Sequence, residues 1–131
     1  MSSLITWVAD HLLARHRQRV QVHLRVHTAM LQTTPPVACH FLNLWNASPE
    51  RRVQVTHVWI EPSGGGHVSV QTRPLPATVE PQHQWETYVP VSAVPPGTDV
   101  EHSARVKLAS GDVIESVPRG DDVPPAGAIP R

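Results

Sequence analysis

Proline placement is the feature that most constrains what this chain can fold into. Fourteen of its 131 residues are proline, and they recur at short intervals from residue 35 onward. Proline lacks an amide hydrogen and clashes with the preceding helical turn, so this spacing excludes long helices and favours short strands joined by turns. The length suits one domain with a single core. We therefore expect a single, all-β domain.

Hydrophobic alternation locates the strands. From residue 20, Val20, Val22, Leu24 and Val26 alternate with polar residues, the pattern of a strand with one buried face. Turn sequences such as "PSGGG" and "SGD" separate further strand-like segments. The three prolines of "RPLPATVEPQ" (73–82) predict a crossing loop. Beyond the first strand, the expected strands cover residues 37–46, 53–61, 67–72, 84–91, 102–109 and 113–117.

Seven short strands at a spacing of roughly 8–12 residues predict an Ig-like or fibronectin-III-like antiparallel β-sandwich over residues 20–118. We expect its core to hold valines, leucines, Phe41 and two tryptophans, with Cys39 as a buried core thiol. His23 and His27 should face solvent on the first strand. Residues 119–131 have no apolar period and are expected to form a Pro-rich extended tail.

Residues 1–19 predict a short amphipathic helix. Leu4, Ile5, Trp7, Val8 and Leu12 form one apolar stripe, and the basic end holds Arg15, Arg17 and Arg19. Spanning a bilayer needs ~20 mostly apolar residues, and secretory signal features are missing. The stripe could pack on its own sandwich, dock on a protein partner or a second copy, or lie in a membrane interface. We expect a cytoplasmic protein, soluble or peripherally attached to a membrane.

The segments "FLNLWNASPERRVQVTHVWIE", "RPLPATVEPQHQWETYVPV" and "ARVKLASGDVIES" resemble a loosely defined group of small uncharacterised bacterial proteins. The shared features correspond to Asn46 at a strand end, the strand 53–58, the loop 75–81 and the hairpin 106–111. The resemblance implies an N-terminal helix, often membrane-associated, followed by an Ig-like sandwich. It implies no particular activity.

Charge and motifs exclude several classes of function. Eleven basic and eleven acidic residues cancel, so net charge does not favour binding to nucleic acid. The single cysteine excludes an intrachain disulfide and fits a reducing compartment. The chain contains no G-x-S-x-G, C-x-x-C, H-E-x-x-H or P-loop motif. No cofactor is therefore predicted.

Nine histidines raise the question of a metal site. His23 and His27 share a strand face but lie ~13 Å apart, too far to bind one zinc ion. His23, His40 and His57 on neighbouring strands leave open a small metal-dependent enzyme. A structural subunit of a phage or secreted assembly is a second alternative. The leading hypothesis is a non-catalytic interaction or accessory module, attached through its N-terminal helix to a protein partner, a second copy or a membrane surface.

Overall fold

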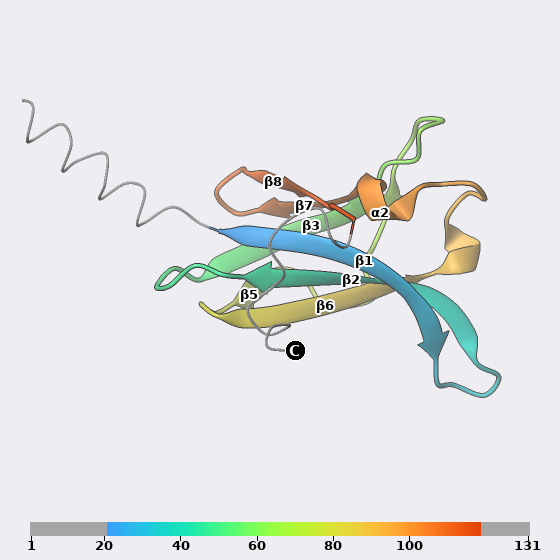
Figure 1. The fold of residues 1–131 in the computed structure, drawn as a ribbon, viewed down its shortest axis with the longest axis horizontal. Helices are drawn as coiled ribbons and strands as arrows, with labels where there is room; N and C mark the ends of the chain where they lie inside the picture. Colours follow the sequence, from blue (N-terminus) through green and yellow to red (C-terminus); the bar gives the residue numbers. More distant parts are fainter. Residues whose placement is uncertain (1–20, 119–131) are drawn as a thin grey trace, which may run out of the picture.

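The computed structural model describes residues 21–118, which form two antiparallel sheets (Figure 1). In sheet A the order is β1 (Val22–Leu31), β2 (Val37–Asn46), β6 (His83–Pro90). In sheet B the order is β4 (Val68–Ser69), β3 (Val53–Ile60), β7 (Ala104–Leu108), β8 (Val113–Glu115), and β5 (Ala77–Val79) also pairs with β3. The predominantly β fold is confirmed.

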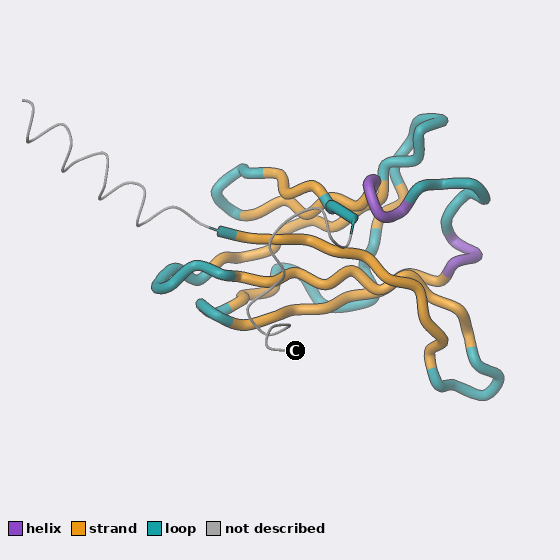
Figure 2. The backbone as a smooth tube through the Cα atoms, viewed as in Figure 1, coloured by secondary structure: helices purple, strands orange, loops and turns teal. Residues whose placement is uncertain are grey.

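Helical structure within residues 21–118 is limited to the 3₁₀ turn η1 (Val91–Ala93) and the single-turn helix α2 (Val100–Ser103). Both lie at the same end of the sheets (Figure 2). Neither helix is long or apolar enough to cross a membrane. The helix predicted for residues 1–19 and the tail predicted for 119–131 lie outside the described residues.

The core lies between the sheets because alternate residues of both sheets point toward each other. In sheet A, Leu24 on β1 lies opposite Leu44 on β2, and both are essentially unexposed. In sheet B, Val106 on β7 pairs with Val58 on β3. Burying such side chains is the main driving force for folding. The principal core residues are Leu24, Val26, Leu42, Leu44, Val53, Val55, Val58, Ile60, Val79, Val89, Ala104, Val106 and Leu108.

Two expectations from the sequence need correction. The predicted crossing loop 73–82 contains an eighth strand, β5, because Ala77 to Val79 pair with the start of β3. Phe41 does not belong to the core cluster, because its register places it on the face of β2 opposite to Leu42 and Leu44. The prediction of a buried core thiol is confirmed for Cys39, which is 1% exposed although it lies outside the main core cluster.

The tryptophans are divided between several environments. Trp85 packs against the core, as predicted for two of them. Trp45 is buried, but its register is that of Phe41 on the outer face of sheet A. Trp59 is half-buried on β3. Trp7 lies outside the described residues.

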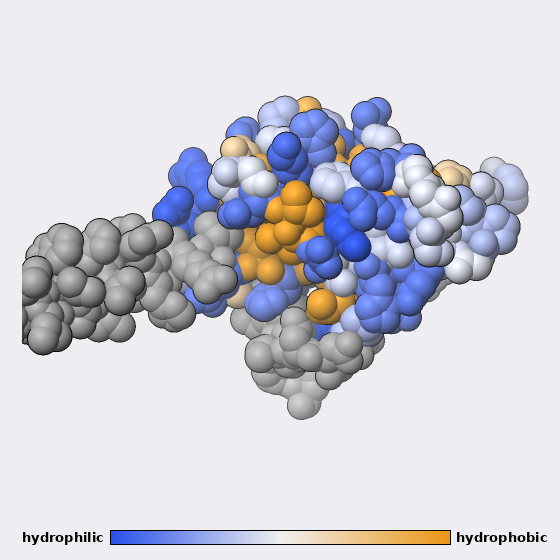
Figure 3. All heavy atoms as spheres, turned by 90° about the horizontal axis from the view of Figure 1, so that it is seen from above, coloured by the Kyte–Doolittle hydropathy of each residue, from blue (hydrophilic) through white to orange (hydrophobic). Residues whose placement is uncertain are grey.

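One edge of the two sheets is closed by the segment after β8. Ser116 forms a parallel bridge with Leu24, and the Val117 amide donates to the Leu24 carbonyl at 3.1 Å. The hydroxyl of Ser116 accepts from the Ala104 amide at 3.1 Å. The chain thus crosses from sheet B to the edge strand of sheet A. Figure 3, which views the molecule from above, shows an apolar patch near the middle of a mostly hydrophilic surface, with smaller apolar groups apart from it.

A buried asparagine joins the two sheets at the end of β2. The Asn46 side-chain nitrogen donates to the carbonyls of Arg51 at 2.8 Å, Val79 at 3.0 Å and Glu80 at 3.2 Å. Its side-chain oxygen accepts from the Ser48 amide at 3.0 Å. Since Asn46 is completely buried, these bonds satisfy groups that would otherwise be costly to remove from water.

The hairpin of β1 and β2 extends beyond the rest of sheet A. β6 pairs with β2 only from Cys39 to Asn46, so the last residues of the hairpin have no third strand beside them. Figure 1 shows these ends curving away from the sheets. Met30 is 51% exposed and Val37 is 38% exposed there. The hairpin end therefore carries apolar side chains that the core does not use.

Candidate functional site

A β-bulge in β3 decides which side chains face outward from sheet B. Val55 pairs with Leu108 and His57 with Lys107, so the pairing skips Thr56. A bulge inserts one residue and shifts the alternation of the strand. Val53 and Val55 before the bulge, and Val58 and Ile60 after it, are all buried. His57 and Trp59 therefore lie on the outer face of sheet B, and Thr56 sits at the bulge itself.

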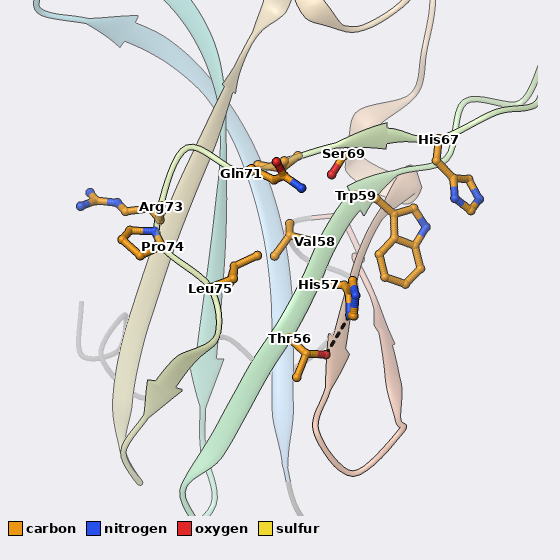
Figure 4. A pocket seen from close by; sticks show the side chains of 11 residues that line it. Thr56, His57, Val58, Trp59, His67, Ser69, Gln71, Arg73, Pro74 and Leu75 are labelled. Atoms are coloured by element: carbon orange, nitrogen blue, oxygen red, sulfur yellow. Dashed lines mark hydrogen bonds between the residues drawn. The ribbon is translucent and has the colours of Figure 1, made fainter.

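Beside this bulge the edge of β3 is open. β5 pairs with β3 from Val53 to Val55, and β4 pairs with it at Trp59 and Ile60. Between them residues 71–76 leave the sheet. A cleft of about 500 Å³ forms there, which we call the β3 cleft (Figure 4). It is lined by Thr56, His57, Val58, Trp59, His67, Ser69, Val70, Gln71, Arg73, Pro74 and Leu75.

The floor of the β3 cleft is apolar. Leu75 packs against the core, and Figure 4 shows Leu75 and Val58 pointing toward one another across the gap between β3 and the loop. Thr72 fixes this loop from the other side, since its hydroxyl donates to the Tyr88 carbonyl on β6. The loop is thus attached to sheet A while its leucine packs under sheet B. The loop that forms this wall of the cleft is therefore held by Thr72 and by Leu75.

Trp59 forms one wall of the cleft and is fixed in orientation. Its indole nitrogen donates to the Glu61 carboxylate at 3.0 Å. His67 stacks on the indole with ring centroids 5.8 Å apart, and its Nε2 lies 3.6 Å from the same Glu61 oxygen. Arg105 Nε lies 3.5 Å from the other oxygen of Glu61. Both oxygens of the Glu61 carboxylate therefore have partners within the protein.

Hydrogen bonding defines the tautomer of His57. The Thr56 hydroxyl donates its only proton to the Lys107 carbonyl at 3.1 Å. His57 Nδ1 lies 3.0 Å from the same hydroxyl oxygen, which can then only accept. Nδ1 must therefore carry the hydrogen, and Nε2 of the neutral ring is an acceptor. No hydrogen bond to Nε2 is found within residues 21–118.

The same proton assignment bears on catalysis. A base activates a hydroxyl by accepting its proton, whereas here His57 donates to Thr56. The Thr56 hydroxyl therefore orients the His57 imidazole and is not activated by it. This arrangement is suited to accepting a hydrogen bond from a bound molecule.

The outer face of sheet A carries a second group of rings. His27 stacks on Phe41 with centroids 5.3 Å apart and planes 13° apart, and Phe41 contacts Tyr88 with centroids at 5.7 Å. These three residues lie directly opposite one another on β1, β2 and β6. We call them the ring ladder. His27 is exposed, and Phe41 and Tyr88 are half-buried.

The residues selected from the sequence do not come together in one site within the part of the chain that the structure describes. The stripe and basic residues of the predicted helix, from Leu4 to Arg19, lie outside the described residues. His23 is half-buried on the outer face of sheet A, together with the exposed His27. His40 has the opposite register on β2, and His57 lies on sheet B. His23, His40 and His57 therefore do not converge, and residues 21–118 contain no group of three potential metal ligands.

The surroundings of His40 alter its titration. Partial burial on β2 lowers the pKa of its imidazole below the ordinary value. Its Nδ1 lies 2.8 Å from the Thr28 hydroxyl on the facing strand. Its neutral form is therefore favoured in the folded protein.

The β3 cleft was not predicted from the sequence, although one signal for it exists there. In "VQVTHVWI" the apolar residues Val53 and Val55 are two positions apart, but Val58 follows after three. A step of three between otherwise alternating residues is the pattern of a bulge. The position of residues 71–76 beside that bulge has no comparable signal, because it depends on the pairing of β4 and β5.

Comparison with known proteins provides no family assignment. No protein-family model and no curated protein matches the chain. It is similar to the "X-ray structure of Northeast Structural Genomics Consortium target SoR45", with a TM-score of 0.34 and 11% identity over 82% of this chain and 92% of that one. At this TM-score the similarity identifies neither a fold family nor an activity.

Proposed function

We propose that this chain is a non-catalytic Ig-like interaction module. The strand order supports the Ig-like part. If β1, β2 and β6 correspond to strands A, B and E, and β3, β7 and β8 to strands C, F and G, the two sheets follow the Ig-type division. In such folds function resides in surfaces rather than in the fold itself.

The ring ladder is the observation that carries the interaction role. His27, Phe41 and Tyr88 cross all three strands of sheet A, yet none of them belongs to the core cluster. Partly exposed aromatic side chains on a regular sheet supply contact area at a low cost in conformational entropy, and aromatic residues are enriched at protein interfaces. The ladder is therefore the proposed contact surface for a protein partner.

Attachment through the N-terminal helix remains part of the proposal. Its apolar stripe of Leu4, Ile5, Trp7, Val8 and Leu12 would bind a protein partner, a second copy or a membrane surface, with Arg15, Arg17 and Arg19 beside it. Liposome flotation and light scattering of the full chain, compared with a Leu4→Ser, Trp7→Ser, Val8→Ser variant, separate these possibilities. If the variant alone aggregates, the stripe packs on its own chain and the attachment role is wrong.

The ladder is tested by proximity crosslinking in cells with the full chain and the double variant Phe41→Ala, Tyr88→Ala. We expect a partner that is crosslinked to the wild-type chain and to Asn43→Ala but not to the double variant. Asn43 is a matched control, because it lies on the same face and bonds Gln84 at 3.0 Å. Equal crosslinking of all three would contradict the ladder. A hydrolytic activity lost on substitution of one histidine would contradict the non-catalytic role.

A second candidate is a structural subunit of a larger assembly. The observation that favours it is the extended β1–β2 hairpin with Met30 51% and Val37 38% exposed. Exposed apolar side chains on a protruding element suit contact with a second copy. Discrete multimers by light scattering that dissociate in a Met30→Ser, Val37→Ser variant would support it.

A further inference from the structure

We propose that the C-terminal segment, residues 119–131, folds back over the outer face of sheet A and covers Trp45 and Arg25. The ring ladder lies further along the same face and stays open beside the segment. The inference concerns contacts within one chain, so it stands independently of the proposed protein partner. Release of the segment would extend the open aromatic surface from the ladder to Trp45.

Two tryptophans on the outer faces of the sandwich differ in exposure. Trp45 and Trp59 each lie in a strand that has a paired strand on both sides. Trp59 stays half-buried even though the His67 ring stacks on it. Trp45 is only 5% exposed. Cross-strand neighbours shield the edges of a ring but not its outward side, so a further part of the chain covers Trp45.

The neighbouring turns and helices run elsewhere. Turns 47–52 and 80–82, at the same end of sheet A as Trp45, lead from this sheet to β3 and β5 of sheet B. The Arg51 carbonyl accepts from the inward side chain of Asn46 at 2.8 Å, which places the first turn on the inner side. The helical turns η1 and α2 lie toward the other end of the sheets (Figure 2).

The C-terminal segment begins beside this face. The Val117 amide donates to the Leu24 carbonyl at 3.1 Å, so residue 118 lies along β1, an edge strand of sheet A. Thirteen residues follow it. At ~3 Å for each residue of an extended Pro-rich chain they reach ~40 Å, whereas crossing from β1 to β6 takes only ~10 Å. The segment is therefore long enough to cross the whole sheet.

The chemistry of the segment matches the face that it would cover. Its "DDVPP" (121–125) places two carboxylates next to a valine and two prolines. Pro-rich extended segments pack on aromatic side chains at a low cost in conformational entropy, which suits Trp45. Carboxylates pair strongly with a guanidinium group, which suits Arg25 in the next row of the sheet.

The other end of the chain is a poorer match. Residues 1–20 join sheet A at Gln21, and their last turn is basic, with Arg15, Arg17 and Arg19. Placed over this face, they would bring positive charge to Arg25. Like charges repel at close range, and acidic residues attract. Charge complementarity therefore selects residues 119–131 as the cover.

The test is NMR of the full chain with a nitroxide spin label at Ala126→Cys. The native thiol is buried, so the new cysteine is the one that reacts. We expect the label to broaden the indole signal of Trp45 beyond detection and to leave that of Trp59 unchanged. Reduction of the nitroxide should restore the Trp45 signal. A label at Glu101→Cys on α2 is the matched control and should leave Trp45 visible.

A charge variant tests how the segment is held. Asp121→Lys and Asp122→Lys together, in the chain labelled at residue 126, should return the Trp45 signal, while Glu101→Lys should not. The unchanged signals of Trp59 and Trp85 report that each variant is folded. A full loss of the Trp45 signal in the double variant would contradict the contact with Arg25.

Three results would overturn the inference. One is a Trp45 signal that the label at residue 126 leaves unchanged. Another is broadening of Trp45 by a label at Ser3→Cys and not at residue 126, which would make the N-terminal segment the cover. The third is broadening of Trp45 in an isotope-enriched, unlabelled chain mixed with a spin-labelled one, which would make a second copy the cover. None of them affects the crosslinking test of the ladder.

Discussion

Sheet A and sheet B are built from similar residues but differ in regularity. β1, β2 and β6 pair without a register shift over their whole contact. β3 has a bulge, and its outer edge is shared by two short strands with a gap between them. Regular pairing brings rings into line across three strands, and the result is the ring ladder. Irregular pairing opens the sheet, and the result is the β3 cleft.

The difference shows how one sandwich offers two kinds of surface. Cross-strand neighbours on a regular sheet lie close together, which suits a flat, extended contact. A bulge redirects side chains locally and interrupts the ladder of hydrogen bonds, which suits a concave site. Both surfaces leave the core unchanged, because the residues on either side of the bulge still point inward.

The largest expected effect comes from deleting single residues of β3. Deletion of Gln54 inverts the alternation before the bulge and should prevent folding. Deletion of Thr56 joins Val55 directly to His57 and keeps Val55, Val58 and Ile60 inward, so this variant should fold. Circular dichroism and urea unfolding compare the two. If both deletions unfold the chain equally, Thr56 is not the extra residue of a bulge.

Substitutions on the two faces of β2 should differ in cost. Leu44→Ala removes a fully buried core side chain and should lower the free energy of unfolding by about 2–5 kcal/mol. Phe41→Ala removes a ring that contacts His27 and Tyr88 outside the core, and should cost about 1 kcal/mol. Urea denaturation measures both. Equal losses would mean that the ring ladder is a second core.

Removing the link between the sheets should have an intermediate effect. Asn46→Ala leaves the carbonyls of Val79, Glu80 and Arg51 and the amide of Ser48 without this partner. We expect a loss of about 2–3 kcal/mol in urea denaturation. Asn43→Ala is the control on the same strand, where the side chain is only half-buried, and it should cost less. A neutral Asn46→Ala would show that the sheets are joined by core packing alone.

The smallest expected effect is the pH dependence contributed by His40. Because the pKa of His40 is lowered in the folded protein, the unfolded chain binds more protons between the two pKa values. Above the unfolded pKa of His40 both states are neutral, and the group costs no stability. As the pH falls from there toward the folded pKa, the free energy of unfolding declines. His40→Gln should therefore lose less stability than the wild-type chain between about pH 7.5 and about pH 5. An unchanged slope would contradict the assignment.

Several elements of the fold were predictable from local pattern. Thr87 and Val89 on β6, and Ala104, Val106 and Leu108 on β7, point inward as their alternation indicates. The "SGD" turn joins β7 and β8 as expected. Phe41 was wrongly predicted to lie in the core, because every hydrophobic residue in an apolar segment is expected to be buried whichever face of the strand it occupies. Only the pairing of β2 with both neighbours assigns its face.

The candidate sites were less predictable, for the same reason. His27, Phe41 and Tyr88 are 14 and 47 residues apart in sequence, and strand register alone places them side by side. The acceptor on His57 depends on a carbonyl of Lys107, which belongs to another strand. No local pattern encodes such a bond.

By itself, the amino-acid sequence determined the class of the fold. Spaced prolines exclude long helices, and alternating apolar residues require sheets with one buried face. Tertiary structure decided which strands pair, which aromatic residues meet, where β3 bulges and which nitrogen of His57 carries a proton. The physical reason is that periodicity is a local property of the chain. Register, cross-strand contacts and hydrogen bonds between distant residues exist only after the sheets have formed.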